Sequence, residues 1–179
     1  MKSRSGRGLV VLPISTRDGK FIARYSVKGL AELAFPLKRA SVSFTPRTDL
    51  PFTIQRWHRT AVIALKRALA GRPPRVLPPL DLSAGTTFQQ RVWNALLKIP
   101  LGQTSSYGEI ARSVGNAKAA RAVGGACGAN PIPIFVPCHR VLDVSQKLGG
   151  FSAGLEWKRL LLWREESRGW WEGEQKPSR

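Results

Sequence analysis

Four prolines within a thirteen-residue segment divide this sequence into two differently patterned parts. The segment spans residues 72–84 and contains Pro73, Pro74, Pro78 and Pro79. Proline lacks a backbone N–H and has a fixed φ, so such a segment suits neither a helix interior nor a central strand. Strand-like stretches precede it and helical patterns follow it. We therefore expect an N-terminal α/β domain over residues 1–80, a helical domain over 81–166 and a loose tail over 167–179.

The pattern before the prolines predicts a small antiparallel sheet followed by one helix. Apolar residues run through 9–12, alternate with other residues through 21–27, and share one face of a third stretch at 31–35. Asp18-Gly19 is a hairpin turn signal between the first two stretches. Apolar residues at helical spacing then predict a helix over 56–70.

Four helix starts are predicted after the prolines, each by a polar residue that can accept a hydrogen bond from a free backbone N–H. These residues are Thr87 (with Gln90), Ser106 (with Glu109), Asn116 and Ser152. Gly115-Asn116 joins the second and third helices, and this arrangement fits a helix-turn-helix. The third helix, over 117–127, consists mostly of Ala and Gly. Small residues let its backbone approach a partner closely, which suits either DNA or another helix.

The charge of the chain predicts a polyanionic partner. Lys and Arg number 29 against 11 Asp and Glu, so the net charge is +18 and the pI is near 11.4. Nucleic acid is the first candidate, and a protein that is merely basic is the alternative. No apolar run reaches the ~18 residues of a membrane span, and residues 9–13 are too short for a signal-peptide core. Two cysteines and two histidines argue against a disulfide framework and a zinc site, so we expect a soluble, intracellular, metal-free protein.

The tetrapeptide Pro137-Cys138-His139-Arg140 carries the clearest chemical signal. The thiolate is the nucleophilic form of cysteine, and an adjacent imidazole or cation favours it. The preceding apolar stretch, 132–136, is expected to hold the thiol in the interior. In isolation, the same tetrapeptide is more typical of an inert, buried structural cysteine.

Motifs around this tetrapeptide occur together in one known family. They are Thr87-Phe88-Gln89-Gln90-Arg91-Val92-Trp93, Ile99-Pro100-Leu101-Gly102-Gln103, Ser106-Tyr107-Gly108-Glu109-Ile110-Ala111, Ala119-Ala120-Arg121-Ala122-Val123-Gly124-Gly125-Ala126, Asn130-Pro131-Ile132-Pro133-Ile134, Val136-Pro137-Cys138-His139-Arg140-Val141 and Gly150-Phe151-Ser152-Ala153-Gly154-Leu155. In order and spacing they resemble the O6-alkylguanine-DNA alkyltransferases (methylated-DNA–protein-cysteine methyltransferases). The N-terminal part resembles the family only in layout. The resemblance implies a ribonuclease-H-like α/β domain, with a small antiparallel sheet and a helix, before a mostly α winged helix-turn-helix domain.

The resemblance also implies that an alkyl group passes from guanine O6 in DNA to the protein's own cysteine. Cys138 corresponds to the nucleophile, His139 to the residue that takes the thiol proton through a bound water, and Glu165 to the carboxylate that orients the imidazole. We expect the first two in an extended segment, where neighbouring side chains point to opposite faces. Asn130 corresponds to the residue that braces the turn below the site, and Tyr107 to the one that helps rotate the phosphate and donates a proton toward the guanine.

Enzymes that react with a stacked base must take it out of the duplex. The resemblance assigns Arg121 to filling the vacated stack. The implied DNA-binding residues are Arg121, Tyr107, Ala120, Gly124, Gly125, Cys127 and Gly128. The implied alkylguanine pocket consists of Val141, Leu148, Phe151, Ser152 and Ala153.

The implied partner is double-stranded DNA containing O6-alkylguanine, with O4-alkylthymine as a further candidate lesion. The product thioether is a poor leaving group, so one molecule is expected to repair one lesion. No cofactor is implied because the lesion itself donates the alkyl group, and no metal is implied. We expect a cytoplasmic monomer that can cluster on DNA, associated with the nucleoid in a prokaryote or nuclear in a eukaryote.

Two other classes of protein share some of these features. Alkyltransferase-like proteins bind the lesion without reacting because they replace the cysteine, and Cys138 argues against this class. A transcription regulator could use the same helix-turn-helix, but the expected domains leave no room for a separate effector domain. Alkyl transfer to the protein distinguishes the first class, and a strong preference for one operator would indicate the second.

Overall fold

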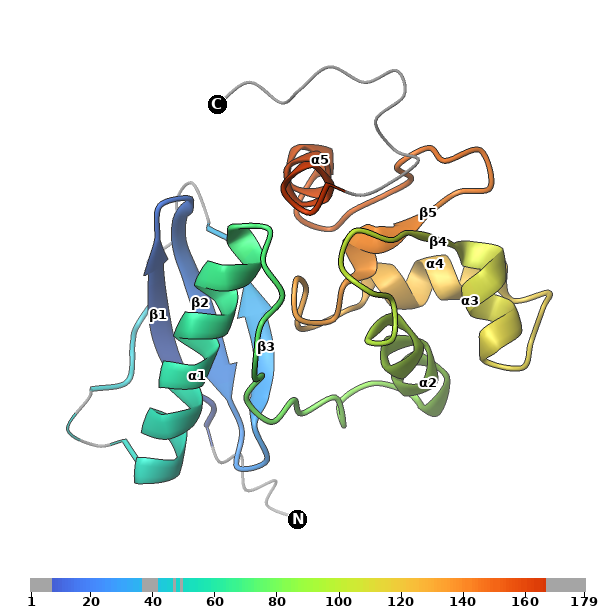
Figure 1. Ribbon diagram of the computed structural model, residues 1–179. Helices are drawn as coiled ribbons and strands as arrows, with labels where there is room; N and C mark the ends of the chain where they lie inside the picture. Colours follow the sequence, from blue (N-terminus) through green and yellow to red (C-terminus); the bar gives the residue numbers. More distant parts are fainter. Residues whose placement is uncertain (1–7, 37–41, 47, 49, 167–179) are drawn as a thin grey trace, which may run out of the picture.

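The computed structural model describes residues 8–36, 42–46, 48 and 50–166. A three-stranded antiparallel sheet, ordered β1-β2-β3, forms the N-terminal part. Its strands are β1 (Val10–Thr16), β2 (Gly19–Tyr25) and β3 (Leu30–Ala34). Figure 1 shows helix α1 (Phe52–Leu69) lying across one face of this sheet. The meander and the helix predicted from the sequence are both present.

The sheet and α1 close over a common core. Phe21, Ala23 and Tyr25 of β2 are buried in it, as alternate residues on one face of a strand should be. Ala61 and Leu65 of α1 lie in the same core, and their spacing puts them on one side of the helix. The apolar residues whose spacing predicted these elements are therefore the ones that form the buried face of each element.

Helix α1 begins at Phe52, one turn before the predicted start at Arg56. Ile54 is buried and extends the apolar face toward the N-terminus. Pro51 precedes the first helical residue, and its carbonyl oxygen accepts the N–H of Gln55 at 3.1 Å. Proline is favoured where no N–H donor is needed, so the extra turn begins at a position that suits it.

The proline-rich segment is bound to the sheet along β3. The Leu30 N–H donates to the Pro79 carbonyl oxygen at 2.8 Å, and the Asp81 N–H donates to the Leu30 carbonyl oxygen at 2.7 Å. The Asp81 carboxylate also accepts a hydrogen bond from the Ser26 hydroxyl. The chain therefore reaches its C-terminal part along the edge of the sheet rather than through a free linker.

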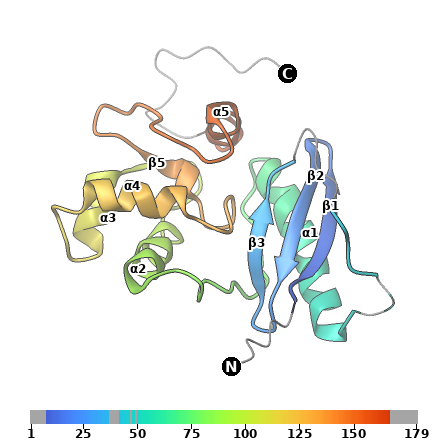
Figure 2. The ribbon, with the colours of Figure 1, turned by 180° about the vertical axis from the view of Figure 1, so that it is seen from behind.

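Helices dominate the described C-terminal part. Its elements are α2 (Thr87–Leu96), β4 (Ser105–Ser106), α3 (Tyr107–Ser113), α4 (Ala120–Gly128), β5 (Val141–Leu142) and α5 (Leu155–Arg164). Strands β4 and β5 form a short parallel ladder. Figures 1 and 2 show α2, α3 and α4 grouped away from the sheet, with α5 lying between them and the turn that joins β1 to β2.

The capping residues of α2 and α3 show how far local sequence determines a helix start. Ser106 and Glu109 form the predicted capping box of α3. For α2 the prediction was wrong by one residue, because Thr86 and Gln89 form the box instead of Thr87 and Gln90. Both threonines precede a glutamine by three residues, so the spacing alone does not distinguish them.

The predicted caps of α4 and α5 were also wrong. Helix α4 begins after Ala119, and Asn116 lies in the preceding turn, where its carbonyl oxygen accepts the Ala119 N–H at 3.0 Å. Helix α5 begins after Gly154, whose φ of 93° suits glycine rather than Ser152 at the entry. Neither helix start has a side-chain cap. The tail predicted over 167–179 lies outside the described residues.

Candidate active site

The thiol of Cys138 is buried at the start of a 3-10 helix, Cys138–Arg140. Only 4% of this residue is exposed. The extended segment predicted here was wrong, because the Arg140 N–H donates to the Pro137 carbonyl oxygen at 3.0 Å and closes a turn. Successive side chains of a 3-10 helix point about 120° apart. Cys138 and His139 therefore do not lie on opposite faces of a strand.

Asn130 braces the loop that leads to the thiol. Its Nδ2 donates to the Val136 carbonyl oxygen at 2.8 Å and to Cys138 Sγ at 3.1 Å. Its Oδ1 accepts the Ile132 N–H at 3.0 Å. Between these contacts, Ile134 has a φ of 75°, a conformation that costs a β-branched residue about 1–3 kcal/mol. One amide side chain thus holds both the strained loop and the sulfur.

His139 and Glu165 form a buried pair beside the thiol. His139 Nε2 lies 2.9 Å from Glu165 Oε1. Burial lowers the pKa of His139, although the hydrogen bond and the charge of Glu165 act to raise it. The imidazole is therefore neutral near pH 7 and its Nε2–H donates to the carboxylate, which leaves Nδ1 as an acceptor. Among the described residues, that Nδ1 is the buried side-chain nitrogen or oxygen atom without a hydrogen-bond partner.

Arg140 completes the site and was not predicted as part of it. Its Nε and Nη2 donate to the two oxygens of Glu165, each at 2.9 Å, and its Nη1 donates to the Ile99 carbonyl oxygen at 2.6 Å. Burial would raise the pKa of Glu165, but its hydrogen bonds with His139 and Arg140 and the charge of Arg140 outweigh it and lower that pKa to about 2. Glu165 therefore stays ionised in the interior.

A buried lysine lies near the sulfur and favours the charged form of the thiol. Burial raises the pKa of the Cys138 thiol, while the Asn130 hydrogen bond and the charge of Lys158 act to lower it. Lys158 Nζ donates to the Val141 carbonyl oxygen at 2.7 Å and to that of Leu148. Burial lowers the pKa of Lys158 to about 8. The resting thiol is protonated, so the site must remove its proton when it reacts.

Tyr107 begins α3 and lies next to two glycines. A Cβ on Gly149 would lie 2.8 Å from the Tyr107 hydroxyl oxygen, and one on Gly124 would lie 3.8 Å from the ring. Burial, with smaller contributions from Cys127, Cys138 and Asp143, raises the pKa of Tyr107 to about 12. The phenol therefore keeps its proton and can act as a donor.

Helix α4 divides the predicted DNA-binding residues between two faces. Arg121, Gly125 and Gly128 are exposed, Ala120 and Gly124 are partly exposed, and a Cβ added to Gly125 or Gly128 would meet nothing within 4 Å. Cys127 departs from the prediction, because it is buried with Val123 and Ala126. Val123 lies one turn before Ala126 and Cys127, so the three residues make up the inward face. The outward face carries the arginine and the small residues.

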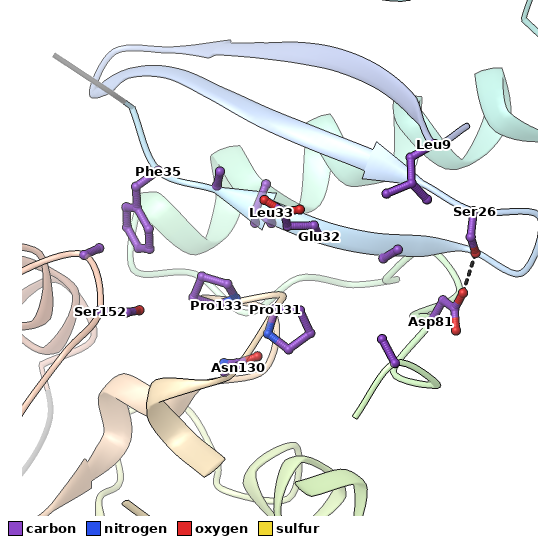
Figure 3. Close-up of a pocket in the computed structure, with 14 residues that line it drawn as sticks. Leu9, Ser26, Glu32, Leu33, Phe35, Asp81, Asn130, Pro131, Pro133 and Ser152 are labelled. Carbon is purple, nitrogen blue, oxygen red and sulfur yellow. Dashed lines mark hydrogen bonds between the residues drawn. The ribbon is translucent and has the colours of Figure 1, made fainter. Parts of the chain in front are cut away.

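The five residues predicted to line an alkylguanine pocket are also divided. Val141 and Leu148 are buried side chains. Phe151 packs edge-on against Phe35, with ring centroids 5.8 Å apart. Ser152 and Ala153 instead line a cavity of about 610 Å³ between β3 and the loop at Asn130, Pro131 and Pro133. Figure 3 shows Asn130, Pro131 and Pro133 facing Leu33 and Phe35 across this cavity, with Ser152 at one end.

Two features are absent from the described residues. Among them, no cluster of three or more His, Cys, Asp or Glu side chains is arranged to hold a metal ion. No helix in this part of the chain combines the length and apolar character that crossing a membrane requires.

Comparisons with known proteins agree with this geometry. Residues 87–167 match the profile of the 6-O-methylguanine DNA methyltransferase DNA-binding domain. The methylated-DNA–protein-cysteine methyltransferase of Mycobacterium tuberculosis is 56% identical over 108 residues, which are 60% of this chain and 65% of the relative. The chain therefore matches less than two thirds of that relative's length.

Solved structures extend the similarity to the N-terminal part. A crystal structure of M. tuberculosis OGT in complex with DNA has 44% sequence identity and a TM-score of 0.71, covering 87% of this chain and 92% of that one. The O6-methylguanine-DNA methyltransferase of Pyrococcus kodakaraensis has 25% identity and a TM-score of 0.54, covering 88% and 99%.

The buried Cys138 thiol lies beside an imidazole that is paired with a carboxylate. This arrangement, near a helix with an exposed arginine, is typical of proteins that use cysteine as a nucleophile. The similarities in sequence and structure then identify the group within that class. The chain belongs to the methylated-DNA–protein-cysteine methyltransferase family.

Proposed function

We propose that this protein repairs O6-alkylguanine in DNA by moving the alkyl group to Cys138. The observation that carries the proposal is the Cys138, His139 and Glu165 arrangement in a chain of this family. The sulfur attacks the alkyl carbon, the bond from carbon to O6 breaks, and its electron pair goes to the guanine. The thioether that forms is a poor leaving group, so each molecule reacts once.

The proton must leave the thiol before or during this attack. His139 Nδ1 is the candidate acceptor because its Nε2–H is engaged by Glu165. The carboxylate then compensates the imidazolium that forms, as in other nucleophile–base–carboxylate arrangements. In our proposal a water carries the proton from the sulfur to Nδ1, and Tyr107 supplies a proton to the departing guanine.

The DNA partner is a duplex carrying the lesion, from which the nucleotide is flipped out. The outward face of α4 supports this proposal, because Arg121 is exposed beside small residues that let the backbone approach a groove. On this view α3 and α4 form the helix-turn-helix of a winged domain over residues 81–166, and residues 1–80 form a ribonuclease-H-like domain. O4-alkylthymine is a second candidate lesion, and we propose a cytoplasmic monomer that clusters on DNA.

Intact mass after incubation with a duplex containing O6-methylguanine tests this function. We expect a gain of one methylene, about 14 Da, confined to the peptide that contains Cys138. A gain on Cys127 would contradict the assignment of the nucleophile. Tight binding of the lesion without any gain in mass would indicate a lesion-binding protein that does not react. The Cys138→Ala variant is the control, and it should bind the duplex and gain no mass.

A further inference from the structure

A partly buried ion pair joins the two parts of the molecule next to the active site. Asp18, in the turn between β1 and β2, accepts two hydrogen bonds from the guanidinium of Arg164 on α5, at 2.8 and 2.7 Å. The two side chains are 13% and 12% exposed. A bidentate pair with so little solvent around it is geometrically demanding as well as strong. Glu165 is the next residue in the chain.

The backbone at this point is enclosed from two sides. Gly71 follows α1 with a φ of 68°, and a Cβ there would lie 1.8 Å from the Arg164 carbonyl oxygen. Gly102 follows α2 with a φ of 79°, and a Cβ there would lie 3.3 Å from the Glu165 carbonyl oxygen. A side chain at Gly71 would collide with the Arg164 carbonyl, and one at Gly102 would press on that of Glu165, so both loops pack closely against the end of α5.

We propose that Asp18 is a positioning residue for alkyl transfer, which holds Glu165 against His139 by fixing Arg164. The inference rests on the proposed function, since it concerns the proton transfer at Cys138. Glu165 is the C-cap residue directly after α5, and helix ends fray unless they are held. Its carboxylate must keep a 2.9 Å contact with the imidazole, and a misplacement of about 1 Å can slow a reaction by ~10²-fold. The N-terminal part thus contributes to the reaction without touching substrate.

The charged groups that face His139 determine how loss of the Asp18–Arg164 pair would change the pH dependence of the reaction. They are Glu165 at the C-cap of α5, Arg140 from the 3-10 helix and Lys158 from α5. Only Glu165 favours the protonated imidazole. Loosening it makes His139 a weaker base, so the sulfur gives up its proton less readily. The apparent pKa for reaction of Cys138 should therefore rise when Asp18 no longer holds Arg164.

The test measures reaction of the full-length protein with free O6-benzylguanine across pH. We expect Asp18→Asn to react about tenfold more slowly at pH 7, with its pH midpoint moved upward. Asp18→Glu, which keeps the charge, should recover most of the rate. The matched control is Glu156→Gln, which removes another carboxylate–arginine pair of α5, at an exposed position. That control should react like the parent.

Thermal unfolding of each variant separates positioning from stability. A slower Asp18→Asn protein that is folded at the assay temperature but has an unmoved pH midpoint would show a structural role only, and would overturn the proposal. A rate within twofold of the parent would overturn it as well. If Asp18→Asn does not fold, Arg164→Lys replaces it with the same readouts, because lysine cannot make the bidentate pair. Failure of the proposed function is distinguishable, since then the parent itself would gain no benzyl group.

Discussion

At the scale of single residues, Glu165 shows what a buried charge requires. It is a buried carboxylate that binds an imidazole and a guanidinium at once. A buried charge is tolerated only when it is paired and hydrogen-bonded. Arg140 therefore has two effects, because it keeps Glu165 ionised and it restricts the carboxylate to one orientation toward His139.

Glu165→Gln is predicted to fold and to transfer alkyl groups much more slowly. The amide can accept a hydrogen bond from His139 but cannot compensate an imidazolium charge. Positioned proton transfer contributes about 10²–10⁴-fold, so the single-turnover rate with an O6-methylguanine duplex should fall within that range. A rate within twofold of the parent would mean that Arg140 or another residue orients His139 unaided.

Arg121→Ala is predicted to separate chemistry from access to the lesion. Reaction with free O6-benzylguanine should persist, because the free base needs only the pocket and Cys138. Duplex repair also requires a flipped nucleotide, which costs a few kcal/mol. Arg121 is expected to offset part of this cost by filling the vacated stack. Losing half of that offset would slow the duplex rate at least tenfold, at about 1.4 kcal/mol per factor of ten.

Measurement at saturating duplex decides what Arg121 does. A flipping defect persists in the single-turnover rate at saturation, whereas a lost phosphate contact is rescued there. Arg112→Ala, which removes an exposed arginine of α3, is the matched control and should show the rescued behaviour.

At the scale of elements, α2 shows how closely two helix starts can compete. Thr86 and Thr87 are adjacent, exposed threonines, and each stands three residues before a glutamine. Only Thr86 accepts the Gln89 N–H, at 3.2 Å, while the Gln89 side chain accepts the Thr86 N–H at 2.8 Å. Two backbone donors at the helix start are thereby satisfied.

Thr86→Ala should lower the free energy of unfolding by about 1 kcal/mol, the usual cost of losing an N-cap. Thr87→Ala, its neighbour and control, should change it by less than about 0.5 kcal/mol, as a surface substitution. Urea unfolding followed by fluorescence measures both. A larger loss for Thr87→Ala would place the cap where the sequence pattern alone suggested it.

The elements also show which features the sequence could predict. Alternation at Phe21, Ala23 and Tyr25 predicted β2 because the buried face is itself periodic. The family resemblance predicted that Glu165 lies near Cys138 and His139, although the two segments are far apart in the sequence. By contrast, the pairing of Asp18 with Arg164 spans 146 residues, and no local pattern reveals a contact of that kind. The sequence did not predict that Cys127 points inward, because the small residues around it obscure the apolar periodicity of α4.

At the scale of the whole molecule, the net charge of +18 is spread over a small protein. We predict that DNA affinity falls steeply with salt and depends little on sequence. Each phosphate neutralised by a cation contributes about −0.9 to the slope of log K against log salt. Fluorescence anisotropy with two undamaged duplexes of unrelated sequence measures this slope. A flat response would show that the charge serves something other than DNA.

Acid should destabilise the molecule in two stages. Burial lowers the pKa of His139, so below about pH 6.5 the unfolded chain binds a proton that the folded protein does not. The folded pKa of Glu165 is about 2, below its ordinary 4.5, so the stability it contributes is present above pH 4.5 and is lost as pH falls toward 2. The second stage is worth a few kcal/mol.

Urea unfolding at pH 7, 5 and 3 measures this loss. Glu165→Gln should depend less on pH than the parent below pH 4.5, where Asp81, Glu109 and Asp143, whose pKa values are also lowered, still contribute, and it should keep part of the dependence above it. Equal steepness in the variant and the parent below that pH would assign the lower stage to other carboxylates.

The covered edges of the sheet have a consequence for solubility. An exposed edge strand offers free N–H and carbonyl groups to any other chain, which is a route to aggregation. Here Thr45 occupies the outer edge of β1 through its contacts with Val11, and Pro79 and Pro131 accept the N–H groups of Leu30 and Leu33 on β3. One of the β3 contacts comes from the proline-rich segment and the other from the loop before the reactive thiol. Cutting the chain between its two parts would therefore expose unpaired backbone groups of β3 on the N-terminal fragment, an edge prone to aggregation.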